Sequence, residues 1–61
     1  MPLVTVKAGE GRTIEQKRVL VKDITEAVVK NFKTEPDSVI VDIVEYSGEN
    51  LAKAGKLFVD R

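Results

Sequence analysis

The chain contains no cysteine, no histidine and no tryptophan among its 61 residues. Without cysteine and histidine it cannot form disulfide bonds or the thiolate and imidazole metal sites that stabilise many small domains. The absence of histidine also removes the side chain that most often exchanges protons near neutral pH. Acid–base chemistry in this chain would therefore need a different group.

An excess of charge of one sign and long apolar runs are also missing. Ten basic and ten acidic residues cancel, and no basic run is longer than Lys17-Arg18. No apolar stretch approaches the roughly 18 residues of a membrane span, and the start of the chain does not resemble a signal peptide. We therefore predict neither a nucleic-acid partner nor a membrane contact, and we expect a cytoplasmic protein.

The short length limits how much core the chain can form. Residues 1–61 have room for a single domain with one thin core. Domains of this size usually depend on disulfides, a metal or a partner chain, and the first two lack their residues here. We therefore expect a homo-oligomer.

The first half of the chain predicts a strand followed by a helix. Residues 3–8 are rich in β-branched side chains and place Val4, Val6 and Ala8 on one face of a strand. After a glycine-containing break, Thr13 and Gln16 have the spacing of a capping box at a helix start. Apolar residues then recur at helical spacing, which predicts an amphipathic helix from Ile14 to about Lys33.

The second half predicts a second strand. Pro36 cannot continue the helix, and residues 39–45 form a nearly continuous apolar run, typical of a strand covered on both faces. A right-handed β-α-β crossover makes the two strands parallel and leaves the helix over one face, an α+β fold. Because a two-stranded sheet is marginal alone, we expect the bare face and open edges to meet another chain.

The tail, residues 46–61, carries a turn signal and then a short apolar set. We interpret it as an arm that packs around a neighbouring chain. A short C-terminal helix is the competing interpretation, and Gly55 in its middle disfavours it by about 1 kcal/mol.

One group that titrates near neutral pH remains, the amine at the chain terminus, with an ordinary pKa of about 7.7–8.0. Removal of Met1 would place this amine on Pro2. A proline amine is secondary and more basic, whereas apolar surroundings and nearby cations lower its pKa. Pro2 is therefore a candidate general base, although a proline at position 2 alone is also consistent with ordinary N-terminal processing.

Arg12 precedes the helix start, where the helix dipole disfavours a cation by a few tenths to about 1 kcal/mol. A role in binding an anionic group such as a carboxylate would explain it, and a solvated turn arginine is the alternative. We interpret Glu10, Lys17 and Arg18 as solvated or structural charges. Glu45 beside Tyr46 could form an acid pair, but a strand end at the solvent is the favoured interpretation.

Other motifs for chemistry are absent: the sequence has no P-loop, no dinucleotide-binding glycine pattern, no metal-ligand cluster and no nucleophile elbow. We therefore expect neither a metal nor a cofactor.

Several of these features occur together in one known family. Met1 is followed by Pro2 and a β-branched strand, and residues 10–17 (EGRTIEQK) then open a long helix, with a glycine-containing segment around Gly55. Over essentially its whole length the chain resembles the 4-oxalocrotonate tautomerase family. The resemblance implies two β-α-β protomers pairing into a four-stranded sheet, and commonly three such pairs in a hexamer.

The same resemblance implies a keto–enol tautomerase, a cofactor-independent isomerase of aromatic compound catabolism. It would move a proton on a 2-hydroxydienoate or related enol acid, with Pro2 as general base and proton shuttle. Arg12, contributed near the proline of another subunit, would bind a substrate carboxylate or stabilise a developing enolate oxygen.

Two substrate-binding positions depart from the family pattern. Ile40 stands where well-studied members carry a second arginine, and Leu51 replaces an aromatic residue. Losing one bidentate arginine contact costs about 1.5–3 kcal/mol. The enzyme would then be weaker, prefer a monoacid such as an arylpyruvate enol, or use another cation in place of the arginine, for which the candidates are Lys33, Lys53 and Arg61.

Two other functions stay open. A hydratase or dehalogenase of the same superfamily would use Pro2 as a cationic acid and need a carboxylate to activate water, for which Glu45 and Asp42 are the candidates. A non-catalytic oligomeric module is the other alternative, consistent with Ile40 and Leu51 in place of polar or aromatic site residues.

Overall fold

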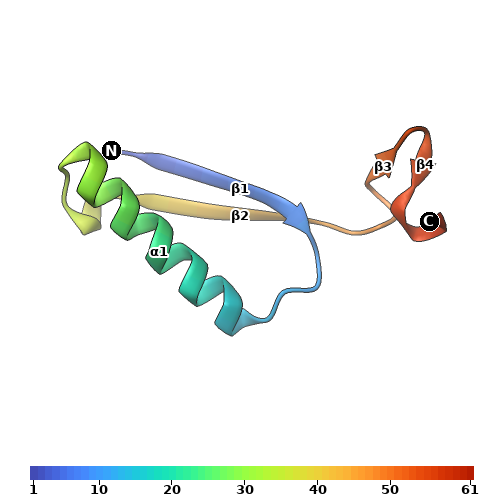
Figure 1. The fold of residues 1–61 in the computed structure, drawn as a ribbon, viewed down its shortest axis with the longest axis horizontal. Coiled ribbons are helices and arrows are strands. Elements are labelled where there is room, and N and C mark those ends of the chain that lie inside the picture. Colours follow the sequence, from blue (N-terminus) through green and yellow to red (C-terminus); the bar gives the residue numbers. More distant parts are fainter.

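A computed structural model describes all residues from Met1 to Arg61. Its central unit is a β-α-β crossover in which β1 and β2 are parallel, and a small antiparallel pair follows (Figure 1). This arrangement confirms the predicted α+β fold. The elements are β1 (Leu3–Gly9), α1 (Ile14–Phe32), the 3-10 turn η1 (Pro36–Ser38), β2 (Ile40–Tyr46), β3 (Ala52–Lys53), β4 (Lys56–Leu57) and the 3-10 turn η2 (Phe58–Asp60).

The two long strands lie in register from the pair Leu3 and Ile40 to the pair Gly9 and Tyr46. Their side chains alternate between the two faces of the sheet, as the pleat of a strand requires. Val4 and Val6 are half-buried on one face, whereas Leu3 is exposed on the other. The face predicted from the sequence is therefore the more buried face of β1.

The boundaries of α1 follow from its caps. The N–H of Gln16 donates to the side-chain oxygen of Thr13, and the N–H of Thr13 donates to the side-chain oxygen of Gln16. This reciprocal pair is the predicted capping box. At the other end Lys33 adopts a left-handed conformation, with φ of 54°, and its N–H donates to the carbonyl of Val29. Both predicted ends of the helix are confirmed.

None of the helices combines the length and the apolar composition that a membrane crossing requires.

The tail forms a tight hairpin in place of the competing C-terminal helix. Ala54 and Gly55 join β3 to β4 and both have positive φ, 52° and 80°. A two-residue hairpin turn with positive φ at both positions matches the twist of its strands, and glycine adopts it without strain. The hairpin lies beyond the end of β2, away from the β-α-β unit (Figure 1). Its packing around a neighbouring chain stays a prediction.

No residue of the single chain is fully buried. Ile40 and Val44 on β2 face away from α1 and are 43% and 36% exposed. The expected cover on both faces of β2 is therefore present on one face only, because a single helix cannot cover two faces of a sheet. The other face displays apolar side chains that a lone chain leaves in contact with water.

Candidate active site

Pro2 directly precedes β1 and is held by β2. The N–H of Ile40 donates to the carbonyl oxygen of Pro2 over 3.0 Å, which extends the parallel ladder by one residue. The proline is half-buried. With Met1 in place the Pro2 nitrogen is a tertiary amide, which has no basicity. Removal of Met1, which is 87% exposed, would convert this nitrogen into an amine on a fixed backbone.

The end of the molecule around Pro2 is rich in exposed apolar side chains. Leu3 and Ile40 pair across the two strands and are 65% and 43% exposed. Phe32, the last residue of α1, is 69% exposed, and Figure 1 shows this end of α1 at the same end of the molecule as the chain terminus. We call this region, residues 1–3 with Phe32 and Ile40, the proline end.

Arg12 lies at the opposite end of the sheet, in the loop between β1 and α1. The N–H of Glu10 donates to the carbonyl of Tyr46 over 2.9 Å, which ties this loop to the end of β2. The positive φ of Gly11, 118°, then lets the chain turn toward the helix. The guanidinium of Arg12 is exposed and has no ion-pair partner. It is therefore available to an anion.

A second cation, Lys17, lies near Arg12 and is already paired. Its ammonium is 2.5 Å from the carboxylate of Glu45, and the two side chains are only 28% and 32% exposed. Both residues line a small cavity of about 70 Å³ together with Arg12. We call this region, Arg12 with Lys17 and Glu45, the arginine end.

The carboxylates considered for water activation both have partners. Glu45 is held by Lys17. Asp42 accepts a hydrogen bond of 2.7 Å from the hydroxyl of Thr5, directly opposite it in the sheet. The acid pair of Glu45 with Tyr46 is not formed, since Glu45 pairs with Lys17 instead.

The structure divides the four candidate site residues into two groups. Ile40 lies with Pro2, whereas Leu51 lines a hollow with Gly9 and Tyr46 near the arginine end. Seven residue steps of about 3.3 Å place Pro2 roughly 23 Å from Gly9, and Arg12 lies beyond Gly9. One copy of the chain therefore cannot bring Pro2 and Arg12 to the same small substrate.

The ion pair of Lys17 with Glu45 is the feature that sequence reasoning missed, because it treated Lys17 as a solvated or structural charge. A signal was present. Lys17 precedes Leu20 and Ile24 at helical spacing, so it belongs to the stripe of α1 that faces the sheet. A partly buried lysine in such a stripe favours an acidic partner on the sheet.

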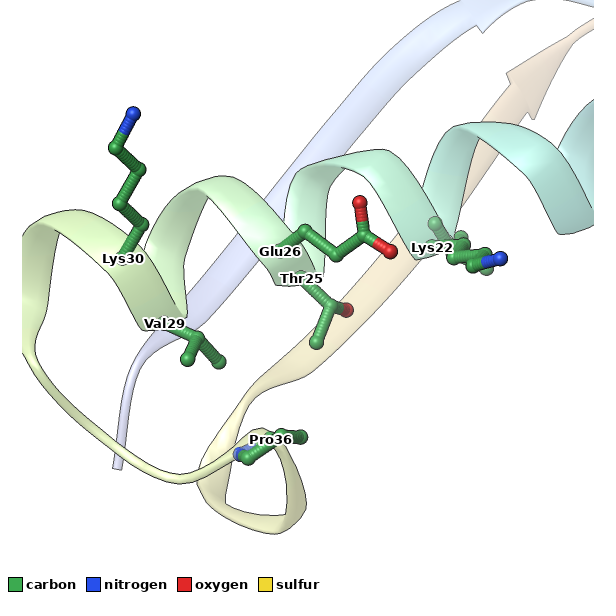
Figure 2. Close-up of a pocket in the computed structure, with 7 residues that line it drawn as sticks. Lys22, Thr25, Glu26, Val29, Lys30 and Pro36 are labelled. Atoms are coloured by element: carbon green, nitrogen blue, oxygen red, sulfur yellow. The ribbon is translucent and has the colours of Figure 1, made fainter.

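A groove beside α1 is distinct from both ends. Figure 2 shows Thr25 and Val29 on the side of the helix toward Pro36, in the turn before β2. This groove contains none of the candidate site residues. Its lining consists of Val21, Lys22, Thr25, Glu26, Val29, Lys30 and Pro36.

Comparison with known proteins identifies the family. The model of the family described as "Tautomerase enzyme" matches residues 2–61. The 2-hydroxymuconate tautomerase of Bacillus subtilis is 47% identical over 60 residues, which cover 98% of this chain and 97% of that protein. The crystal structure of a 4-oxalocrotonate tautomerase homologue superposes with a TM-score of 0.96 at 33% identity, covering 100% of this chain and 97% of that chain.

A third comparison bears on assembly. A heterohexamer 4-oxalocrotonate tautomerase from Chloroflexus aurantiacus superposes with a TM-score of 0.88 at 25% identity, covering 98% of this chain and 97% of that chain. The agreement of the family model, the relatives and the solved structures extends over nearly the full length of the chain. The chain belongs to the tautomerase family.

Proposed function

We propose that this chain is a keto–enol tautomerase, an isomerase that uses the Pro2 amine, freed by removal of Met1, as general base and proton shuttle. Its substrate is a 2-hydroxydienoate or related enol acid, and it acts in the cytoplasm. The observation that carries the proposal is the placement of Pro2: its carbonyl is fixed by Ile40 in a chain whose family match begins at Pro2. A base on a rigid strand has a defined direction toward its substrate.

The reaction moves one proton and needs no other reactant. The neutral amine of Pro2 takes a proton from one atom of the enol acid, and the resulting ammonium returns it to a carbon of the same molecule. The keto product and the neutral amine result. A positioned general base of this kind contributes about 10²–10⁴-fold to the rate.

Arg12 binds the substrate carboxylate or stabilises the enolate oxygen that develops during the transfer. Its guanidinium has no ion-pair partner in the chain, which supports this role. Because Pro2 and Arg12 lie at opposite ends of the sheet, the two groups at one site come from different copies of the chain. Self-association is then a requirement of the chemistry.

We propose that residues 1–61 form one unit of such an assembly. Two copies pair into a four-stranded sheet, and three pairs make a hexamer. The exposed Leu3 and Ile40 supply apolar surface for contacts between copies. The heterohexamer of Chloroflexus aurantiacus supports this assembly size, since a chain of it superposes on nearly the whole of this one.

Ile40 and Leu51 point to a substrate with a single carboxylate. Both are apolar, and Ile40 lies exposed beside Pro2. An apolar side chain at this place favours an aryl or alkyl group on the substrate and gives no hydrogen bonds to a second carboxylate. We therefore propose an arylpyruvate enol as a better substrate than 2-hydroxymuconate.

The hydratase alternative has less support. It needs a carboxylate free to activate water, and Glu45 and Asp42 each have a partner already.

The test is ketonisation of phenylenolpyruvate and 2-hydroxymuconate, followed by ultraviolet absorbance. Protein shown by mass spectrometry to lack Met1 is compared with a chain that carries one non-removable residue before Pro2. A chain with one extra residue at the C-terminus is the control. We expect the N-terminal extension to lower kcat at least about 100-fold, since an amide cannot act as base. Equal rates for the two proteins would contradict the proline mechanism.

A further inference from the structure

We propose that Lys17 is a positioning residue: by occupying the carboxylate of Glu45, it keeps the guanidinium of Arg12 free to receive a substrate carboxylate. This inference rests on the role given to Arg12 under the proposed function. It concerns two residues next to the site that bind no substrate themselves.

The three charged groups share one cavity. Arg12, Lys17 and Glu45 all line the space of about 70 Å³ between the start of α1 and the ends of β1 and β2. Glu45 is the one acidic residue in that lining, and the rest of it is apolar or glycine. The lining therefore holds two cations and a single carboxylate.

In the structure Glu45 pairs with Lys17 and not with Arg12. Its ammonium lies 2.5 Å from the carboxylate of Glu45, and each side chain is about two-thirds removed from water. Such an ion pair is less screened than the surface pair of Glu15 with Arg18, whose side chains are 73% and 64% exposed. Arg12 has no ion-pair partner.

The backbone explains why Glu45 pairs with Lys17. Its N–H donates to the carbonyl of Thr13 over 3.1 Å, so Lys17 lies in the capped first turn of α1. Glu45 lies within β2, opposite Ala8. Two regular elements thus present these side chains to each other, whereas Arg12 lies in the loop between β1 and α1.

Removing the Lys17 ammonium would leave the Glu45 carboxylate without a partner in a partly buried position. An unpaired carboxylate there is costly, and an arginine satisfies it with two parallel hydrogen bonds. Arg12 is the remaining cation in the cavity lining. It would turn to Glu45, and a substrate carboxylate would then have to displace Glu45 to bind.

Removing Glu45 has a different result. Lys17 is released to the solvent, and Arg12 still has no internal partner. The double replacement removes both the protecting cation and the competing carboxylate. The two single variants should therefore differ in their affinity for a substrate carboxylate. Adding Glu45→Gln to Lys17→Met should restore the affinity that Lys17→Met loses.

The experiment uses Lys17→Met, Glu45→Gln and the double variant, each lacking Met1 and checked for folding and assembly by circular dichroism and sedimentation. Steady-state kinetics on phenylenolpyruvate give kcat and KM. Calorimetry with 3-phenylpropionate, which has a carboxylate but no enol, gives a Kd that does not depend on turnover. Lys22→Met, which deletes an equal charge on the groove side of α1, is the matched control.

We expect Lys17→Met to raise KM and the Kd of 3-phenylpropionate about tenfold with little change in kcat, the effect of about one lost charged contact. Glu45→Gln, the double variant and Lys22→Met should stay within about threefold of the parent. In Lys17→Met the side-chain Nε–H resonance of Arg12 should shift in ¹⁵N NMR as the guanidinium bonds to Glu45. An unshifted resonance would mean that only the local charge matters and would overturn the proposal.

Other outcomes separate this proposal from the proposed function. Equal losses in Lys17→Met, Glu45→Gln and the double variant would overturn it, because the pair would then be purely structural. If the parent protein shows no proline-dependent turnover but the Kd values keep the expected order, the tautomerase assignment fails and the positioning role stands.

Discussion

The two ends of the β1–β2 sheet differ in what they offer to a substrate. The proline end presents Pro2 among exposed apolar side chains, Leu3 and Ile40 among them. The arginine end presents a free guanidinium beside the paired charges of Lys17 and Glu45. One end has the candidate base and the other has the candidate anion-binding group, so neither end alone is a complete tautomerase site.

The physical reason for this division is the length of the chain. A unit of 61 residues with no buried residue has too little material to enclose a substrate within one copy. In the proposed assembly, joining unlike ends of two copies would remove apolar surface from water and complete the site in the same step. Stability and catalysis then depend on the same contacts.

The largest effect expected from a single side chain at the arginine end belongs to Arg12. Arg12→Ala should lower kcat/KM on phenylenolpyruvate about 10- to 100-fold, the equivalent of about 1.5–3 kcal/mol for a lost charged hydrogen bond. Arg18→Ala is the control, because Arg18 forms an exposed pair with Glu15 on the same helix turn, and it should change kcat/KM less than about threefold. Equal losses in the two variants would show that net charge, and not a specific contact, is what matters.

A smaller effect, on selectivity, is expected at the proline end. Ile40→Arg gives this end a guanidinium, which should raise the ratio of kcat/KM for 2-hydroxymuconate over phenylenolpyruvate about tenfold. Ile40→Leu keeps the position apolar and should leave the ratio unchanged. The backbone N–H that holds Pro2 is present in both variants. If Ile40→Arg leaves this kcat/KM ratio unchanged, residue 40 does not face the substrate.

The smallest effect is expected from the helix cap, which supports the arginine end alone. Thr13→Ala removes the hydroxyl that accepts from the Gln16 N–H and should lower the free energy of unfolding by about 1 kcal/mol. Thr13→Ser keeps this bond and serves as control. Urea denaturation must be done at one protein concentration, because assembly contributes to stability. An unchanged free energy of unfolding in Thr13→Ala would mean that the cap is redundant in the assembled protein.

The elements could be predicted because their signals are local. The Thr13–Gln16 capping box and Pro36 delimit α1, and the alternation of Val4 and Val6 identifies the more buried face of β1. The hairpin was not predicted, since Ala54 and Gly55 lack the Asn-Gly signature of its turn.

The site was predictable only as a set of single residues. Pro2 and Arg12 could be named from their positions in the sequence, but their separation along the sheet follows from the length of β1. The pairing of Lys17 with Glu45 joins residues 28 positions apart, and such a contact depends on how α1 lies over the sheet. The helical spacing of Lys17 indicates that it faces the sheet, but local patterns do not identify its partner there.

The central claim is that one site combines Pro2 of one copy with Arg12 of another, and mixing two impaired variants tests it most directly. A chain with a blocked N-terminus and the Arg12→Ala chain are unfolded together, refolded and assayed on phenylenolpyruvate. Random mixing should restore about a quarter of the parental rate, because sites that join the intact Pro2 of one variant to the intact Arg12 of the other then form. A mixture no more active than its two components would contradict a site shared between copies.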